Sequence, residues 1–261
     1  MHVMSFNLRF ASDEEPNAWP RRRPVMGELL RQERPDLIGT QEGLYDQLDD
    51  VAAELGPDYG AIGLGREGGS RGEFMMIFFT KDRLRPREFD HFWLSDTPNV
   101  IGSQSWGGCA PRMVTWARFA DTHTGAEFYA INTHFEVFDT GAREKSADLL
   151  LARLTELDPA LPVVVTGDFN APAEPGQTVY DALVTTGPLV DTWVTAAERG
   201  PAFATFHGYR PPEPDGVRID WILASPSIRT SRTWVNTFHR DDQYPSDHLP
   251  VQAILELPTG G

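Results

Sequence analysis

The sequence has little cysteine and no long apolar run. A single cysteine, Cys109, rules out an intramolecular disulfide and a cysteine-rich zinc site, and a lone cysteine is more often a packed or loop residue than a nucleophile. No apolar run approaches the ~20 residues that span a bilayer, and the N-terminus lacks a basic region followed by an apolar stretch. We therefore expect no transmembrane segment and a soluble protein, cytoplasmic or, if a signal peptide was removed before residue 1, secreted.

Positive charge is also scarce. The chain has 23 Lys and Arg against 38 Asp and Glu, a net charge of −15. Such a surface repels nucleic-acid backbones unless a local positive patch or bound cations reverse its sign. The one basic run, Arg21-Arg22-Arg23, is interpreted as the solvated start of a helix. Tight, non-specific DNA binding is therefore disfavoured, but a nuclease is not excluded, because a carboxylate-lined metal site needs negative charge before the ion arrives.

The 261 residues, 40% of them hydrophobic, suffice for a large core. No repeat or linker divides them, so we expect a single domain over residues 1–261 and a monomer. Strands are expected at His2–Leu8, Asp36–Thr40, Glu73–Thr80, Met113–Ala120, Glu127–His134, Pro162–Gly167, Arg218–Ala224 and Val251–Leu257. Helical spacing is found in Val25, Leu29 and Leu30, in Leu44, Leu48, Val51 and Leu55, and in Leu149, Leu150, Leu154 and Leu157. The interleaved pattern predicts an α/β (α+β) fold of stacked sheets with helices on their outer faces.

Polar residues interrupt or end these apolar strands at six places. They are Asn7, Glu42, His134, Asp168 with Asn170, Asp220, and Asp247 with His248. Burying an unpaired charge costs several kcal/mol, so such groups are retained only with partners or a cation. Any one of them alone could be a turn residue or a packed core histidine. Six together favour one shared site.

At these positions the sequence resembles the endonuclease/exonuclease/phosphatase superfamily, which has the deoxyribonuclease I-like fold. The matching segments, in the family's order, are Ser5–Arg9, Thr40–Glu42, Asn132–His134, Gly167–Ala171, Arg218–Ile222 and Ser246–Val251. The ordered set is highly specific and spans nearly the whole chain. The resemblance implies a four-layer sandwich, with two central β-sheets flanked by helices and the site at one end of the sheets.

The resemblance also implies a metal-dependent phosphoesterase. Glu42 matches the family's principal metal carboxylate, and Asn7 and Asp247 match positions that lie beside the ion or bind it. The expected cofactor is Mg²⁺, a hard ion that takes a few protein oxygens together with water and substrate oxygens, and Mn²⁺ is expected to substitute. Such a cation neutralises charge on a phosphate ester and supports the leaving group.

Five positions match the family's catalytic residues. Asp220 matches the carboxylate paired with His248, where the acid fixes the tautomer and raises basicity. Either Asp168 or His248 could activate water. Asn170 would hold a phosphate oxygen or Asp168 itself, and His134 would reach another non-bridging oxygen.

Four further residues have weaker claims. Glu73 resembles a second acidic position, expected to bind substrate or support the metal, although a solvated strand start is the alternative. Arg112 would face the phosphate or form a surface ion pair. His207 could line the pocket or be a turn residue. Arg9 stands where some family branches carry an acid, which argues against a second carboxylate-bound metal.

Substrate choice depends on loops, where the sequence is less informative. The segment Phe92–Arg112 contains Trp93 and Trp106, which could stack on a ring or anchor the loop. The substrate is a phosphate ester, and we favour a compact phosphodiester or phosphomonoester over long duplex DNA, with a nuclease acting on single-stranded or duplex nucleic acid as the alternative. A catalytically inactive binding module would have lost some of the polar residues, and a glycosidase would leave Asn7, Asn170 and His248 unexplained.

Overall fold

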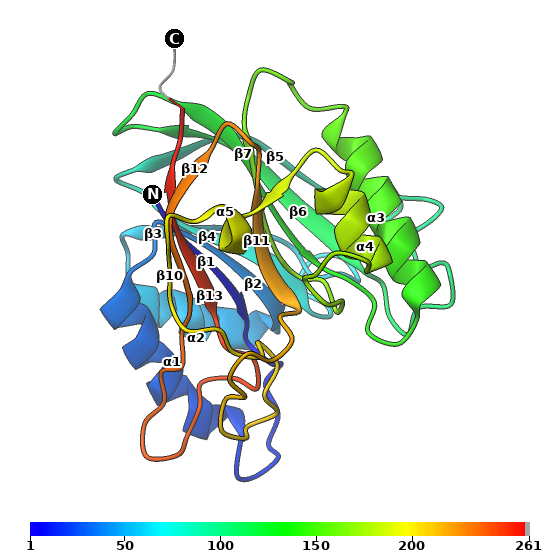
Figure 1. Cartoon of the computed structure of the whole chain (residues 1–261). Coiled ribbons are helices and arrows are strands. Elements are labelled where there is room, and N and C mark those ends of the chain that lie inside the picture. The colour runs from blue at the N-terminus through cyan, green and yellow to red at the C-terminus, as the bar shows by residue number, and fades with distance from the viewer. Residues whose placement is uncertain (259–261) are drawn as a thin grey trace.

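The computed structural model describes residues 1–258, whose strands form two sheets packed face to face (Figure 1). The seven-stranded sheet contains, in spatial order, β10 (Glu198–Arg199), β12 (Arg229–Val235), β13 (Val251–Glu256), β1 (His2–Asn7), β2 (Leu37–Gly43), β4 (Phe74–Thr80) and β3 (Tyr59–Ile62). The six-stranded sheet contains, in spatial order, β5 (Leu84–Trp93), β6 (Met113–Asp121), β7 (Glu127–His134), β8 (Val163–Asp168), β11 (Asp220–Ala224) and β9 (Val190–Asp191).

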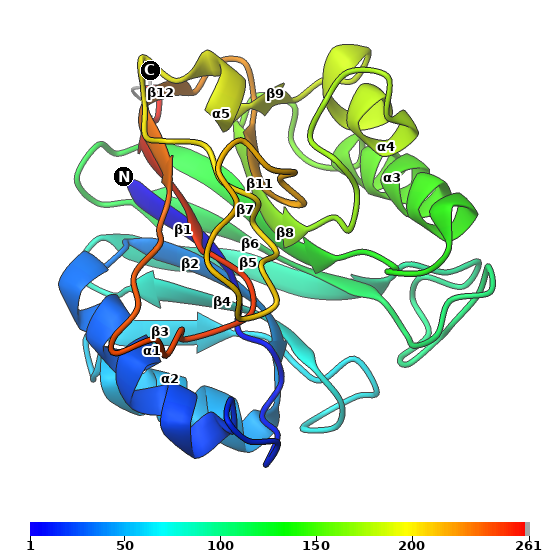
Figure 2. The ribbon, with the colours of Figure 1, turned by 60° about the horizontal axis from the view of Figure 1, so that its bottom comes forward.

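Helices cover the outer faces of both sheets (Figure 2). The helices of the described chain are α1 (Trp19–Glu33), α2 (Tyr45–Leu55), α3 (Thr140–Leu154), α4 (Thr178–Tyr180), the π-helical turn η1 (Asp181–Thr185) and α5 (Thr192–Thr195). Helices α1 and α2 lie on the seven-stranded sheet, and α3 and α4 lie on the six-stranded sheet. None of the helices in residues 1–258 is long and apolar enough to cross a membrane.

Three hydrophobic cores separate the layers. Strand β1 shows why, because its side chains alternate between two of them: Val3 packs between the sheets, while Met4 and Phe6 pack against α1 and α2. A third core joins the six-stranded sheet to α3 and includes Val165 and Leu150. A strand that is buried on both faces has a continuous run of apolar residues, and the sequence contains such runs. The predicted four-layer sandwich is confirmed.

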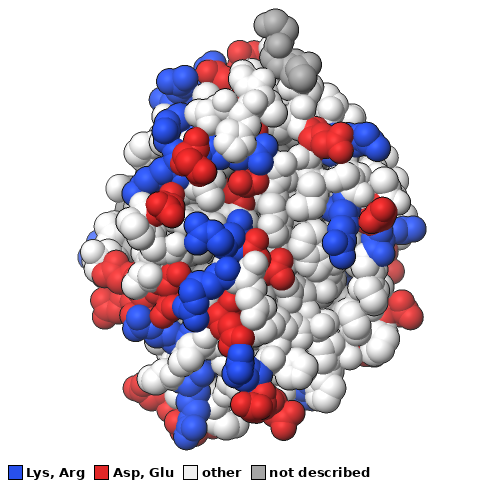
Figure 3. Space-filling view, turned by 90° about the vertical axis from the view of Figure 1, so that its left-hand side faces the viewer, with Lys and Arg blue, Asp and Glu red and all other residues white. Residues whose placement is uncertain are grey.

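The eight predicted strands and three predicted helices are all present, with ends that differ by a few residues. Strands β3, β5, β9, β10 and β12 were not predicted. Strand β5 lies at an edge of its sheet and is exposed over most of its length, so its sequence has no apolar pattern. On the face shown in Figure 3, basic and acidic side chains are intermingled, and neither sign forms a continuous stripe.

The interpretation of Arg21-Arg22-Arg23 as a solvated run is wrong for its middle residue. Arg22 lies in the first turn of α1 and is fully buried. Its guanidinium donates to five backbone carbonyls, those of Leu8, Arg9, Phe10, Asn17 and Pro245, over 2.8–3.1 Å. All five N–H groups of an arginine are thus satisfied without a carboxylate. Arg22 joins α1 to the segment that follows Asn7 and to the segment that precedes Asp247.

We predict that Arg22→Met lowers the free energy of unfolding by about 3 kcal/mol or more, because it leaves buried carbonyls without donors. The neighbouring Arg21 is the matched control, since its side chain is 63% exposed and, within residues 1–258, forms an ion pair only with Glu15. Arg21→Met is expected to change stability by less than about 0.5 kcal/mol. Urea unfolding of both variants measures the difference, and equal effects would contradict a structural role for the buried guanidinium.

Candidate active site

The predicted site residues meet at one end of the two sheets. Strands β7 and β8 run parallel, and their register places His134 beside Asp168. Strand β11 is antiparallel to β8, and its first residue, Asp220, lies opposite Asp168. In the other sheet, β1 ends at Asn7 next to the parallel strand β2, which carries Glu42. Residues far apart in sequence are therefore side by side because of strand register.

A cleft of about 510 Å³ opens over these strand ends, within the range of small-molecule sites. The predicted site residues that line it are Glu42, Glu73, Arg112, His134, Asp168, Asn170, Asp247 and His248. Asn7, Asp220 and His207 are buried outside its lining. Asn7 and Asp220 contact lining residues directly, whereas the His207 ring nitrogens face the carbonyl oxygens of Arg210 and Ser246 at 2.7 and 3.1 Å.

Asp168 is the centre of the polar contacts. Its Oδ2 accepts a hydrogen bond from Asn7 Nδ2 at 3.0 Å and lies 3.5 Å from His134 Nε2 and 3.8 Å from His248 Nε2. Its Oδ1 accepts from the backbone N–H of Asn170 at 2.9 Å. Burial, followed by the charge of Asp220, raises the pKa of Asp168 to about 7. This carboxyl group can therefore take up or release a proton near neutral pH.

His248 has the opposite electrostatic character. Its Nδ1 faces Asp220 Oδ2 at 2.9 Å, which fixes the ring and leaves Nε2 directed toward Asp168. Burial lowers the pKa of His248, but the charges of Asp220 and Asp168 outweigh this effect and raise the pKa to about 10. His134, by contrast, is held neutral because burial lowers its pKa well below the usual value. The cleft thus contains one imidazolium and one neutral imidazole.

Two of these residues have a left-handed backbone conformation, with a positive φ. Glu42 has a φ of 63° and lies where the register between β2 and β4 shifts, between Thr40 and Gly43. Such a bulge redirects a side chain relative to the strand. Asn170 has a φ of 49°, a conformation that asparagine tolerates better than most residues. Non-glycine residues in this region cost of order 1–3 kcal/mol and concentrate at functional sites.

The donor set fits a metal ion. Glu42 and Asp247 approach the same guanidinium, with Glu42 Oε2 3.9 Å from Arg9 Nη1 and Asp247 Oδ2 3.8 Å from Arg9 Nε. Glu42, His134 and Asp168 place ligand atoms within 4.8 Å of one another. Burial, together with the nearby charge of Glu42, raises the pKa of Asp247. Closely spaced, partly buried carboxylates of this kind are what a divalent cation with oxygen ligands requires.

Two arginine–carboxylate pairs form part of the cleft wall. Arg66 Nη1 lies 2.6 Å from Glu73 Oε2, and Arg112 Nε lies 3.3 Å from Glu136 Oε2. Arg112 is buried, and its Nη1 has no hydrogen-bond partner within residues 1–258. The alternative interpretation of Glu73 as the solvated start of a strand is wrong, because Glu73 is largely buried and burial raises its pKa. Likewise, a surface ion pair does not describe Arg112.

Several supporting residues were not assigned a role from the sequence. Asn132 accepts from Gln41 Nε2 at 2.7 Å and from the Thr166 hydroxyl at 3.2 Å, which links the two sheets behind the site. The Ser246 hydroxyl donates to the carbonyl of Asn7 at 2.7 Å and so holds the Asp247–His248 segment. Each of these residues lies in or beside one of the segments that carry the family resemblance. Their polar side chains within apolar runs could have identified them as supporting residues from the sequence.

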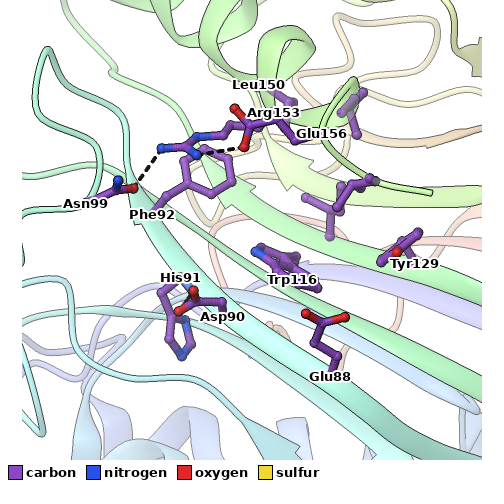
Figure 4. Close-up of a pocket in the computed structure, with 13 residues that line it drawn as sticks. Glu88, Asp90, His91, Phe92, Asn99, Trp116, Tyr129, Leu150, Arg153 and Glu156 are labelled. Carbon is purple, nitrogen blue, oxygen red and sulfur yellow. Dashed lines mark hydrogen bonds and ion pairs between the residues drawn. The ribbon is translucent and has the colours of Figure 1, made fainter. Parts of the chain in front are cut away.

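A second cleft, of about 280 Å³, lies between α3 and the outer face of strands β5, β6 and β7 (Figure 4). Trp116 and Tyr129 form an edge-to-face pair in its floor. At its rim, Arg153 donates to Asn99 and to Glu156. None of its lining residues belongs to the acid–histidine cluster of the first cleft.

The two-sheet fold and the acid–histidine cluster in the first cleft define a hydrolase of the deoxyribonuclease I-like class. The family model described as Endonuclease/Exonuclease/phosphatase family matches residues 4–248, and the chain belongs to that family. A search of curated proteins found no significant match.

Solved structures agree with this assignment. An endonuclease/exonuclease/phosphatase family protein from Bacteroides thetaiotaomicron is 35% identical, with a TM-score of 0.92 over 99% of this chain and 98% of that one. The mannosyl-6-phosphatase of Bacteroides thetaiotaomicron VPI-5482 is also 35% identical, with a TM-score of 0.91 over 98% of this chain and 100% of that one. The catalytic domain of human Nocturnin, solved with a bound sulfate, shares the fold at 18% identity and a TM-score of 0.75, over 99% and 94% of the two chains.

We predict that Asp220→Asn lowers the pKa of His248 in the metal-free protein, because it removes the nearest negative charge. In the wild type, the raised pKa contributes stability that is complete below the unfolded-state value of ~6.5 and is lost as the pH rises through about 10. The variant should show a weaker decline of stability across this interval. NMR titration of the His248 ring measures the pKa directly, and an unchanged value would contradict the pairing.

Proposed function

We propose that this protein is a Mg²⁺-dependent phosphoesterase that hydrolyses a compact phosphate ester by attack of water. The observation that carries the proposal is the buried cluster in which Asp168 lies between two imidazoles, 3.5 and 3.8 Å away, beside the carboxylates of Glu42 and Asp247. A proton-exchanging acid, a fixed positive charge and a set of oxygen ligands are the groups that phosphate-ester hydrolysis needs.

Each polar residue of the cluster has its own role in the proposed reaction. Asp168, whose raised pKa suits proton exchange near neutral pH, takes the proton from the attacking water. His248, held as an imidazolium by Asp220, stabilises negative charge on the phosphate. Neutral His134 donates to a non-bridging oxygen, and Asn170 holds Asp168 through its backbone N–H. The unpaired Nη1 of buried Arg112 is a further donor for the phosphate.

Glu42 and Asp247 would hold the metal ion, with Asn7 supporting Glu42 through a 2.9 Å hydrogen bond. A bound Mg²⁺ supplies charge neutralisation and support for the leaving oxygen, and Mn²⁺ can replace it because the protein ligands are few. Arg9 places a positive charge beside both carboxylates, which supports one metal ion rather than two.

The preferred substrate is a phosphomonoester. The likeness to a mannosyl-6-phosphatase at 35% identity over nearly the whole of both chains supports this choice. The net charge of −15 argues against long nucleic acid. Likenesses to Nocturnin and to zebrafish TDP2 solved with a single-stranded DNA product are at 18% and 16% identity and show the fold alone.

We expect hydrolysis of mannose 6-phosphate or bis-p-nitrophenyl phosphate in the presence of Mg²⁺ or Mn²⁺ and loss of activity in EDTA. Glu42→Gln should raise the metal concentration needed for half-maximal rate, because one anionic ligand is removed. Glu14→Gln, at an exposed position, is the control. Full activity in chelator, or identical metal titrations for both variants, would count against the metal site.

Asp168→Asn should lower kcat by about 10²-fold or more, since the amide cannot accept the proton from water. Its free energy of unfolding should be no lower than that of the wild type at pH 8, because the buried carboxylate is destabilising in its charged form. Asp148→Asn, on the exposed face of α3, is the control for kcat. A near-normal rate in Asp168→Asn would remove this residue from catalysis.

A further inference from the structure

Two exposed aromatic rings stand at the mouth of the catalytic cleft. Phe138 is 81% exposed and Phe206 is 47% exposed, and both line the cleft. Phe138 follows β7 in the loop that leads to α3, and Phe206 lies in the segment before β11. The two rings come from distant parts of the chain, and both remain in contact with water in a protein that buries most of its other phenylalanines.

The loop that carries Phe138 is fixed even though its ring is exposed. The backbone N–H of Phe138 donates to Glu136 Oε1 at 3.1 Å, and Glu136 is buried beside Arg112. Arg143 donates to the carbonyls of Glu136 and Val137 at 3.0 and 2.9 Å. The loop is therefore tied to the same carboxylate that positions a phosphate-binding arginine.

Phe206 is held in the same manner. The hydroxyl of the preceding Thr205, which is fully buried, accepts from the backbone N–H groups of Ile219 and Asp220 at 2.9 and 3.1 Å. The next residue, His207, donates its backbone N–H to the carbonyl of Asp247 at 2.9 Å. The Phe206 ring itself lies 5.0 Å from the ring of His248. The backbone beside each aromatic side chain is thus hydrogen-bonded to residues in or next to the proposed active site.

Solvated aromatic rings on a fixed backbone at a cleft indicate a ligand surface. Aromatic side chains have few rotatable bonds, so they offer a large apolar contact area at low entropic cost. Because the backbone that carries each ring is held before binding, it loses little freedom when the ligand arrives. The geometry therefore favours a leaving group with a flat apolar face above the phosphate site.

The same cleft has a polar wall suited to hydroxyl groups. Arg66 and Glu73 are both largely buried and paired at 2.6 Å, and Arg66 Nε has no partner within residues 1–258. A hydroxyl can donate to a carboxylate and accept from a guanidinium. The arginines of the lining are already paired: Arg66 with Glu73, Arg112 with Glu136, and Arg9 with two metal-site carboxylates. Within residues 1–258, the lining has no further arginine or lysine for a second backbone phosphate.

We infer that Phe138 and Phe206 bind the ring of a phosphorylated pyranose, and that Arg66 and Glu73 bind its hydroxyls. This inference rests on the proposed phosphoesterase function and names the substrate class of the same site. The sugar's C–H face lies on the aromatic rings, its phosphate enters among Arg112, His134 and His248, and its hydroxyl edge meets the polar wall. These residues select the substrate and take no part in proton transfer.

Steady-state kinetics in Mg²⁺ test the inference. Mannose 6-phosphate carries the pyranose, glycerol 3-phosphate has hydroxyls without a ring, and adenosine 5′-monophosphate has a base. The wild type should prefer mannose 6-phosphate. Phe138→Ala and Phe206→Ala should each lower the ratio of kcat/KM for mannose 6-phosphate to that for glycerol 3-phosphate about tenfold, mainly through KM, because the stacking contact is present in both ground and transition states.

Phe89→Ala is the matched control, since Phe89 is 57% exposed on β5 and does not line the cleft. Its ratio should equal that of the wild type, and Phe138→Tyr should keep the preference that the alanine variant loses. An unchanged ratio in both alanine variants, or a preference for adenosine 5′-monophosphate, would overturn the inference alone. Failure to hydrolyse any of the three esters would overturn the proposed function and the inference with it.

Discussion

The site depends on one electrostatic constraint: two buried carboxylates, Asp168 and Asp220, face each other across adjacent antiparallel strands. Two like charges in such a place are tolerated only if a proton or a cation stands between them. His248 supplies that charge from a different segment, with Nδ1 2.9 Å from one carboxylate and Nε2 3.8 Å from the other. The same arrangement lets Asp168 exchange a proton near neutral pH while His248 stays positively charged.

The second requirement is that the two sheets approach closely enough for their residues to share one site. Gly39 shows how close they are, because a Cβ added there would lie 1.9 Å from the Thr166 hydroxyl oxygen. Asn132 fills the remaining space and bonds to Gln41 on one sheet and Thr166 on the other. This polar link lets Asn7, at the end of β1, reach Asp168 at the end of β8. A site shared by two sheets therefore needs a small residue and a satisfied amide behind it.

The sequence predicted the features that burial imposes on composition. Strands buried on both faces were predicted from their apolar runs, and the polar residues that meet at the first cleft were identified because they interrupt those runs. Edge strand β5 was missed because solvent permits a charged sequence there. The burial of Arg22 could not be predicted from its neighbours in the sequence, because one of its acceptors is a carbonyl 223 residues away. Likewise, the orientation of Phe138 and Phe206 toward the cleft follows from tertiary contacts that no local pattern encodes.

The position of β1 has a consequence for the order in which the protein can be assembled during synthesis. Strand β1 lies between β2 and β13 in the seven-stranded sheet, so one of its two neighbours is translated long after it. Until β13 has been translated, one edge of β1 has no partner strand. Until Pro245 has been translated, the Arg22 guanidinium also lacks one of its five carbonyl acceptors. In a nascent chain that emerges N-terminus first, this apolar strand therefore keeps an unpaired edge until β13 has been made, and unpaired strand edges favour aggregation.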